Sequence, residues 1–172
     1  KAGGMAYSKW QEATAGKDSG TLAALVQERC EAAALPMNEL FAFSPDEALV
    51  RAGLHLCGHP ERGVVPCAVA DLFDVPGLPT AAGTAFLASA RRPAFEATEW
   101  IKRMGAAGFC VCGKTRVNGF GLMDGAHHCA RDLVGSGALP LALVTDFGGN
   151  AGRGLPERPR PRLSPAANAP AR

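Results

Sequence analysis

Residues 65–84, which read VPCAVADLFDVPGLPTAAGT, decide the fold of this 172-residue chain. They open within an apolar and β-branched run, Val64–Val69, which lies between a glycine and an aspartate and so predicts a buried strand. Turn signals follow, chief among them the Pro76-Gly77 dipeptide. We therefore expect Leu72–Ala90 to be a long irregular connection that leads away from the end of the strand.

A helix and a second strand are predicted beyond this connection. The spacing of apolar residues indicates a helix that begins near Pro93 and has a buried face made of Ala97, Trp100, Ile101 and Met104. Gly108 is placed to end it, and Phe109–Cys112 has the character of a strand with Cys110 and Cys112 on one face. A strand, a helix and a strand form a βαβ unit, which predicts parallel pairing. The expected fold class is therefore α/β, with a mixed, largely parallel sheet flanked by helices.

Further elements are expected on both sides of this unit. A helical pattern of apolar residues begins at Thr21. A short strand over Leu40–Phe43 leads to a helix that Ser44 would cap and Gly53 would end, and one more strand is expected over Ala138–Thr145. The organisation by residue ranges is an N-terminal segment at 1–20, an α/β domain at 21–150, and an Arg/Pro-rich tail at 151–172 that we expect to be disordered.

Composition and charge exclude several classes of protein. No apolar run reaches the ~18 residues of a membrane span, and no secretory signal is visible at the N-terminus. The net charge is +2, but the tail from Ala151 onward has five arginines and one glutamate, so the body before it is mildly acidic. An acidic body argues against nucleic-acid binding. The six cysteines lie mostly in apolar runs, which indicates reduced thiols and a cytoplasmic location.

Two other patterns suggest chemistry, but we interpret both as structural. Zinc ligands are offered by a His-x-Cys-x-His segment and by a His-His-Cys segment, whose members are His55, Cys57, His59, His127, His128 and Cys129. Their spacing fits no common zinc motif, so we expect no metal. Gly113-Lys114-Thr115 matches the end of a phosphate-binding loop, but the residues before it form a strand rather than a loop, which excludes nucleotide binding.

Residues 65–84 also match a longer known segment, IPVAVKDLFDVAGLPTTAGS, almost residue for residue. Residues 97–115 follow with a helix, a Gly-Ala turn and a strand that ends in Gly-Lys-Thr. Residues 139–150, LPLALVTDFGGN, are similar to VPLALGTDTGGS. Together, in this order, the three segments resemble the N-terminal part of the amidase signature family.

The resemblance implies a fold and a mechanism. Family members have a mixed sheet covered by helices, and they hydrolyse amides, or move the released ammonia, with a Ser–cis-Ser–Lys triad. One serine attacks the carbonyl carbon, while the second serine and a neutral lysine relay its proton to the leaving amine. Backbone N–H groups of a turn hold the oxyanion, and the matching turn here is Thr145, Asp146, Phe147, Gly148 and Gly149. Small amides would be the substrates, and no cofactor is implied.

All three triad positions are substituted in this chain. The family's lysine precedes the Asp-Leu-Phe motif, where this chain has Ala70. The family's nucleophile follows Thr-Asp-x-Gly-Gly, where Asn150 stands, and the family spacing places His127 at the cis-serine. An alanine cannot relay a proton, and an asparagine amide is not a nucleophile of this kind. The sequence therefore predicts that the chain does not hydrolyse amides by the family mechanism.

Three hypotheses for the function remain open. The chain is an enzyme of the amidase class, a non-catalytic relative that binds a small amide or a partner protein, or a truncated and decayed copy without activity. The oxyanion turn could still bind a carbonyl group, or it could be only a turn that needs glycine. A sheet shortened relative to the family would leave an edge strand, which self-association or a partner chain would cover.

Overall fold

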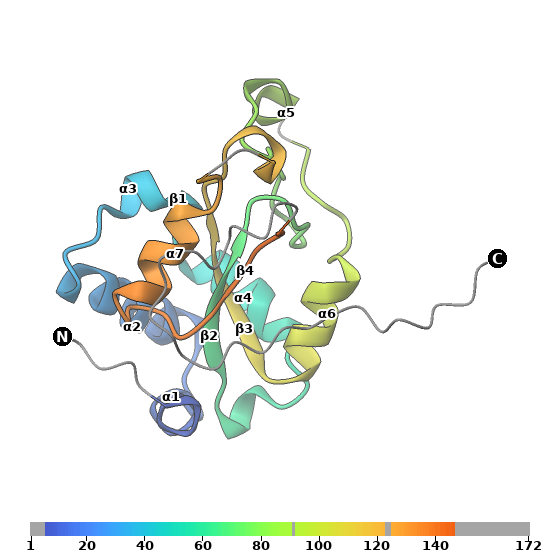
Figure 1. The fold of residues 1–172 in the computed structure, drawn as a ribbon. Coiled ribbons are helices and arrows are strands. Elements are labelled where there is room, and N and C mark those ends of the chain that lie inside the picture. Colours follow the sequence, from blue (N-terminus) through green and yellow to red (C-terminus); the bar gives the residue numbers. More distant parts are fainter. Residues whose placement is uncertain (1–5, 91, 123–124, 147–172) are drawn as a thin grey trace, which may run out of the picture.

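The computed structural model describes residues 6–90, 92–122 and 125–146. In chain order, its helices and strands are α1 (Tyr7–Thr14), α2 (Ser19–Ala32), α3 (Met37–Leu40), β1 (Phe41–Phe43), α4 (Glu47–His55), η1 (Pro60–Arg62), β2 (Val65–Ala70), α5 (Ala85–Ala90), α6 (Glu99–Ala106), β3 (Phe109–Thr115), η2 (Gly119–Gly121), α7 (His128–Gly135) and β4 (Ala142–Leu143). Figure 1 shows a central sheet with helices on either side of it.

The strands form one sheet in the order β1-β3-β2-β4. Strand β2 runs parallel to β3 and to β4, whereas β1 pairs antiparallel with β3. Helix α6 lies on the path from β2 to β3, so the chain makes the βαβ unit that the sequence predicted (Figure 1). The expected fold class, a mixed and largely parallel sheet flanked by helices, is confirmed.

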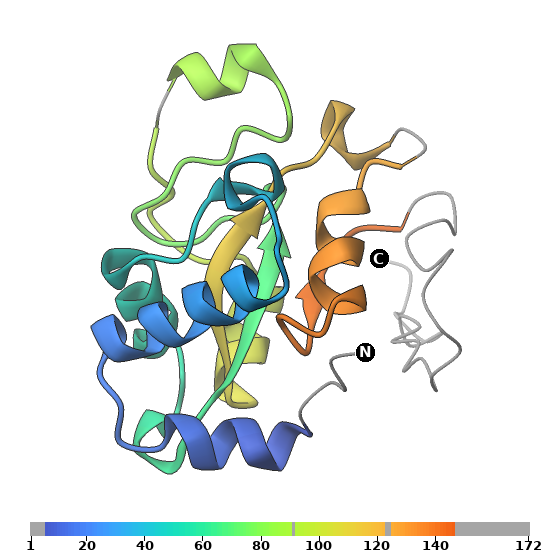
Figure 2. The same ribbon diagram turned by 90° about the vertical axis from the view of Figure 1, so that its left-hand side faces the viewer.

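Strand β2 is buried over its whole length. Its run of apolar residues without alternation suits a strand that is covered on both faces. Helices α2 and α7 cover one face of the sheet and α6 covers the other, as two views at right angles show (Figures 1 and 2). Two layers of apolar side chains result, one on each face.

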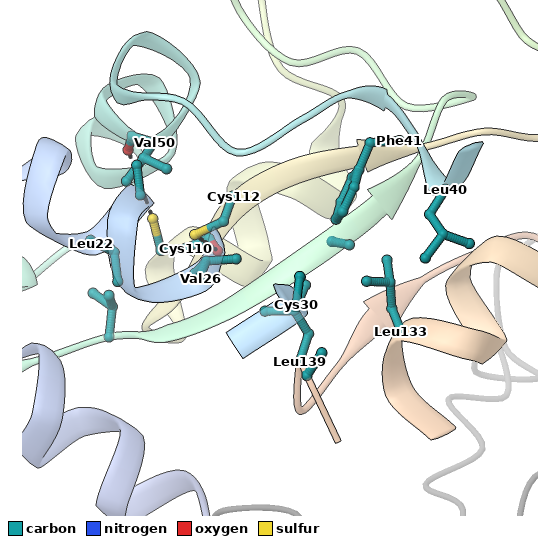
Figure 3. Close-up of a cluster of buried hydrophobic side chains, with 14 of the residues drawn as sticks. Leu22, Val26, Cys30, Leu40, Phe41, Val50, Cys110, Cys112, Leu133 and Leu139 are labelled. Carbon is teal, nitrogen blue, oxygen red and sulfur yellow. Dashed lines mark hydrogen bonds between the residues drawn. The ribbon is translucent and has the colours of Figure 1, made fainter. Parts of the chain in front are cut away.

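Strand β3 divides its side chains between these two layers. Cys110 and Cys112 join Leu22 and Val26 of α2 on one face (Figure 3), whereas Val111 joins the cluster around α6 on the other. The prediction that the two cysteines share a face is confirmed. All six cysteines of the chain are buried and free, and burial raises the pKa of Cys30 to about 11. The six cysteine side chains are therefore part of the protein core.

Helix α4 differs from its prediction at both ends. Asp46 is the capping residue, because its carboxylate accepts a hydrogen bond from the Leu49 backbone N–H at 2.8 Å, and Ser44 lies outside the helix. The helix also continues through Gly53 to His55. Gly53 lies against β3, where a Cβ atom would collide with the carbonyl oxygen of Val111. This glycine allows close packing of a helix on a strand and does not end the helix.

Helix α6 begins at Glu99, later than the expected start near Pro93. Pro93 instead makes an isolated antiparallel bridge with Pro79. The later start leaves a short helix whose buried side is centred on Ile101, and Trp100 is 48% exposed, with the guanidinium carbon of Arg103 5.9 Å from the centre of its ring. The prediction that Trp100 is a core residue is therefore wrong.

Three further elements depart from the sequence pattern. Helix α1 lies in a region without a visible period, and its Trp10 is 1% exposed. Helix α5 occupies the end of the connection that was expected to be irregular. Strand β4 pairs only at Ala142–Leu143, inside the longer strand that was expected. The tail at 151–172 lies outside the described residues.

Candidate functional site

The candidate site lies where the parallel strands end. In a parallel sheet the carboxyl ends of the strands meet at one edge, which is the usual place for a ligand in α/β folds. Ala70 ends β2 and pairs in register with Thr115, which ends β3. Ala70 is fully buried, so the position that the sequence comparison assigns to the family's lysine holds a methyl group in the core.

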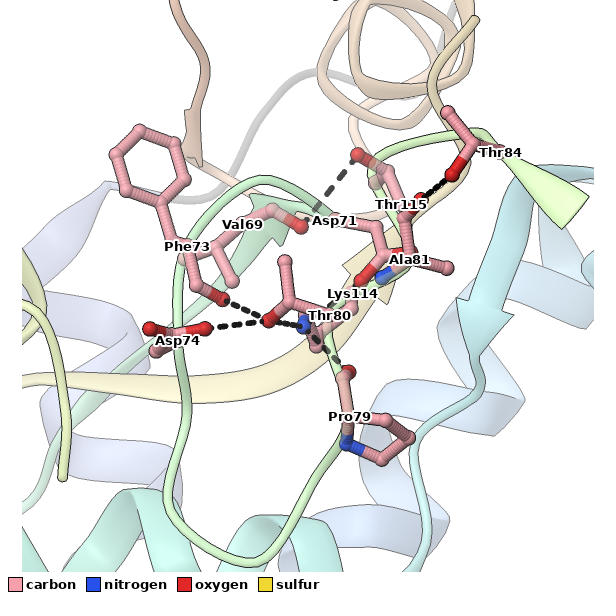
Figure 4. Close-up of polar contacts among 10 residues, drawn as sticks. All are labelled: Val69, Asp71, Phe73, Asp74, Pro79, Thr80, Ala81, Thr84, Lys114 and Thr115. Atoms are coloured by element: carbon pink, nitrogen blue, oxygen red, sulfur yellow. Dashed lines mark hydrogen bonds and ion pairs between the residues drawn. The ribbon is translucent and has the colours of Figure 1, made fainter. Parts of the chain in front are cut away.

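A buried ion pair follows directly after Ala70. The Nζ atom of Lys114 lies 2.7 Å from Oδ1 of Asp71, and the two side chains are 0% and 3% exposed. Figure 4 shows how the loop after β2 closes around this pair. Lys114 donates to the Pro79 carbonyl oxygen at 2.9 Å and to Thr80 Oγ1 at 2.8 Å, while Asp71 Oδ2 accepts from the Ala81 backbone N–H at 3.2 Å.

Lys114 combines an ion pair with two hydrogen bonds. An ammonium group has three N–H donors, and here they meet a carboxylate, a carbonyl oxygen and a hydroxyl group. Burial lowers the pKa of Lys114, and the charge of Asp71 opposes that effect. The ammonium group therefore holds the loop in place.

Sequence analysis missed this pair because it considered Lys114 only as part of a phosphate-loop pattern. A signal was nevertheless present. Lys114 comes two residues after the predicted strand Phe109–Cys112, and Asp71 comes two residues after the predicted strand Val64–Val69. Since parallel strands end side by side, two opposite charges in such apolar surroundings point to a partnership.

His127 and Thr145 form a second polar contact near this edge. The His127 Nε2 atom lies 3.1 Å from Thr145 Oγ1. The His127 ring is 8% exposed, and its Nδ1 atom is buried with no hydrogen-bond partner among the described residues. Burial lowers the pKa of His127 and the charge of Asp146 opposes that shift, so the ring is neutral at pH 7.

Gly121 makes room for this contact. Its φ angle is +72°, and a Cβ atom on it would lie 3.0 Å from Thr145 Oγ1, 3.2 Å from His127 Cε1 and 2.7 Å from a methyl carbon of Leu72. The contact is therefore adjacent to Leu72, which follows the ion-paired Asp71 in the sequence. The structure thus brings together His127, assigned to the cis-serine position, and Thr145, assigned to the oxyanion turn.

The rest of the predicted site is not described. Phe147, Gly148, Gly149 and Asn150 lie outside the described residues, so the oxyanion turn is seen only as far as Asp146. Within the described ranges, no group of three or more His, Cys, Asp or Glu side chains could hold a metal ion. None of the helices in those ranges has the length and hydropathy needed to cross a membrane.

A pocket of about 790 Å³ opens on the other side of the ion pair. Its walls come from β1, from the segment between Pro79 and Ala88, and from Arg116 to Asn118 after the end of β3. Asp71 reaches its inner wall. This pocket was not visible in the sequence, because β1 and the loop after β2 meet only in the folded chain.

Several solved structures of other proteins have a similar fold. The structure of 6-aminohexanoate cyclic dimer hydrolase matches with a TM-score of 0.58 and 18% identity over 70% of this chain, and its complex with substrate matches with 0.53 and 20% over 73%. A protein from an unexpected vestigial complex, which reveals the evolutionary origins of an s-triazine catabolic enzyme, matches with 0.59 and 18% over 80%.

The chain shares its fold with part of each of these proteins. It spans 29%, 33% and 36% of the length of the three matched chains, about a third of each. No family model and no curated protein matches the sequence. The shared fold confirms the architecture that the three motifs implied.

We predict that the buried pair stabilises the fold only as a pair. Asp71→Asn leaves the ammonium of Lys114 without its counter-charge, and the free energy of unfolding should fall by about 3 kcal/mol in urea titrations. The double variant Asp71→Leu/Lys114→Met, which removes both charges, should be less destabilised than Asp71→Asn. Arg51→Gln breaks an exposed ion pair with Glu47 and is the control, with an expected loss of at most ~0.5 kcal/mol. Equal losses in Asp71→Asn and Arg51→Gln would contradict the prediction.

His127 should make the stability depend on pH. Because its folded pKa is lowered from 6.5, the unfolded chain binds the proton more tightly, so the contribution is complete above pH 6.5 and is lost as the pH falls below it. His127→Gln should therefore show a smaller drop in melting temperature between pH 7.5 and pH 5 than the wild type. His55→Gln, at an exposed position of α4, should keep the wild-type drop. The same drop in His127→Gln as in the wild type would show that this ring is not responsible.

Proposed function

We propose that the chain is an amidase-like hydrolase relative that does not cleave amides by the Ser–cis-Ser–Lys mechanism. The observation that carries the proposal is the buried methyl group of Ala70 at the end of β2. In the motif match, this residue stands where the family has its lysine. A proton relay needs a titratable group at that point, and a methyl group cannot supply one.

Lys114 does not take over the role of the family's lysine, whose position is occupied here by Ala70. The ammonium group of Lys114 is ion-paired with Asp71 and donates hydrogen bonds to the Pro79 carbonyl oxygen and to Thr80 Oγ1. A general base needs a free lone pair, which a lysine held as an ammonium by a carboxylate lacks. The substitution of Asn150 for the family's nucleophile points the same way.

The proposal is tested by ammonia release from a panel of small aliphatic and aromatic amides, together with labelling by a fluorophosphonate, which reacts with activated serines. We expect no saturable release of ammonia and no labelled serine. Asn150→Ala and His127→Ala preparations are the controls, because a contaminating amidase would give the same signal in all three. Saturable hydrolysis by the wild type that is lost in either variant would contradict the proposal.

A second function, non-catalytic binding of a small molecule, is favoured by the pocket of about 790 Å³ beside the ion pair. Its volume falls in the range of roughly 300–1,000 Å³ that is usual for small-molecule sites. Such a function needs no nucleophile, so it is compatible with Ala70 and Asn150. The free and buried cysteines are compatible with a cytoplasmic location for either function.

Association with a partner chain or a second copy is also part of the proposal. Strand β4 lies at one end of the strand order, and Leu141–Val144 are only partly buried, which supports pairing along this edge. One structural relative comes from a vestigial protein complex. Light scattering over a range of concentrations should show a mass above that of the monomer, and a monomer at every concentration would contradict self-association.

A further inference from the structure

We propose that the pocket between β1, α5 and the end of β3 binds a ligand with a carboxylate group and an apolar body, and that Arg116 binds the carboxylate. This inference rests on the second function above, small-molecule binding. It does not depend on whether the chain hydrolyses amides, so the two proposals fail in separate experiments.

The charge of the pocket favours an anion. The charged side chains among its lining residues are those of Asp71 and Arg116. The charge of Asp71 is balanced by Lys114, whose Nζ lies 2.7 Å away behind the pocket wall. Arg116 makes no ion pair within the described ranges, so its charge is the one left uncompensated in the pocket.

Arg116 is also held in place to receive a carboxylate. Its backbone N–H donates to the Leu40 carbonyl oxygen at 2.9 Å, and its side-chain Nε donates to the Asn38 carbonyl oxygen at 3.2 Å. The first contact anchors the backbone just after the end of β3, and the second orients the guanidinium group, whose terminal amino groups make no hydrogen bond or ion pair with the described residues. A guanidinium group can bind both oxygens of a carboxylate, and a fixed one loses less freedom on binding.

The walls of the pocket fit an apolar body. Phe43, Pro79 and Val117 contribute apolar surface, and small alanine side chains leave the volume open, among them Ala85 and Ala88 of α5. A volume of about 790 Å³ is far larger than a carboxylate alone requires. An alkyl or aryl group would fill this space and remove its apolar walls from water.

The test uses 3-phenylpropionate as the probe and follows its binding to the whole chain by calorimetry and by amide chemical shifts. We expect saturable binding, with shifts in residues 81–88 and 116–118. Two further compounds test the contributions of the carboxylate and of the aryl group separately. The amine analogue 3-phenylpropylamine lacks the carboxylate, and propionate lacks the aryl group, so both should bind more weakly. Absence of binding by 3-phenylpropionate, or binding of the amine with equal affinity, would overturn the proposal.

Three variants test whether 3-phenylpropionate binds in this pocket. Arg116→Gln should weaken the binding of 3-phenylpropionate by about tenfold or more, because it removes a charge-assisted pair. Ala88→Trp, which fills the pocket from α5, should weaken it without changing any charge. Arg131→Gln removes an arginine that is exposed on α7, outside the pocket, and should bind as the wild type does. A cooperative thermal melt of each variant shows that it is folded, and wild-type affinity in folded Arg116→Gln would overturn the proposal.

Discussion

The complete burial of β2 is the constraint on which the rest of the structure depends. Its backbone groups pair with parallel strands on both sides, and its side chains need a cover on both faces. Helices α2 and α7 supply one cover and α6 the other. Glycines allow close packing elsewhere around the sheet: a Cβ atom at Gly53 of α4 would collide with the Val111 carbonyl oxygen of β3, and one at Gly105 of α6 with the Leu56 carbonyl oxygen. The two clusters of apolar side chains follow from this one strand.

The same strand determines the chemistry at its end. As β2 leaves the core, the chain passes from the buried Ala70 to the charged Asp71, which must be paired because an isolated buried carboxylate is costly. Lys114 of β3 makes that pair and binds the loop through Pro79 and Thr80. Lys114 therefore has a structural role. A hydrolytic site of the amidase type needs the opposite arrangement, with a lysine free to move a proton.

The parts of the fold that were predictable from sequence are those set by local patterns. The apolar run of β2, the glycine at position 108 that was expected to end a helix, and the alternation at Cys110 and Cys112 led to the βαβ unit. The predictions were wrong at residues whose role is set by packing in the folded chain rather than by the local sequence pattern. Gly53 was expected to end a helix, but it is needed for contact with β3, and Trp100 lost its expected burial because α6 starts late.

The sequence by itself determined the α/β class, the order of β2, α6 and β3, and the absence of a titratable group at Ala70, because each depends on residue types and on their local spacing. Only the tertiary structure decided that Lys114 neutralises Asp71, that His127 contacts Thr145, and that Arg116 lines a pocket. The physical reason is that the first two contacts join residues 43 and 18 positions apart and the pocket joins segments still farther apart, so their distances are set by how the strands and loops pack rather than by any local pattern.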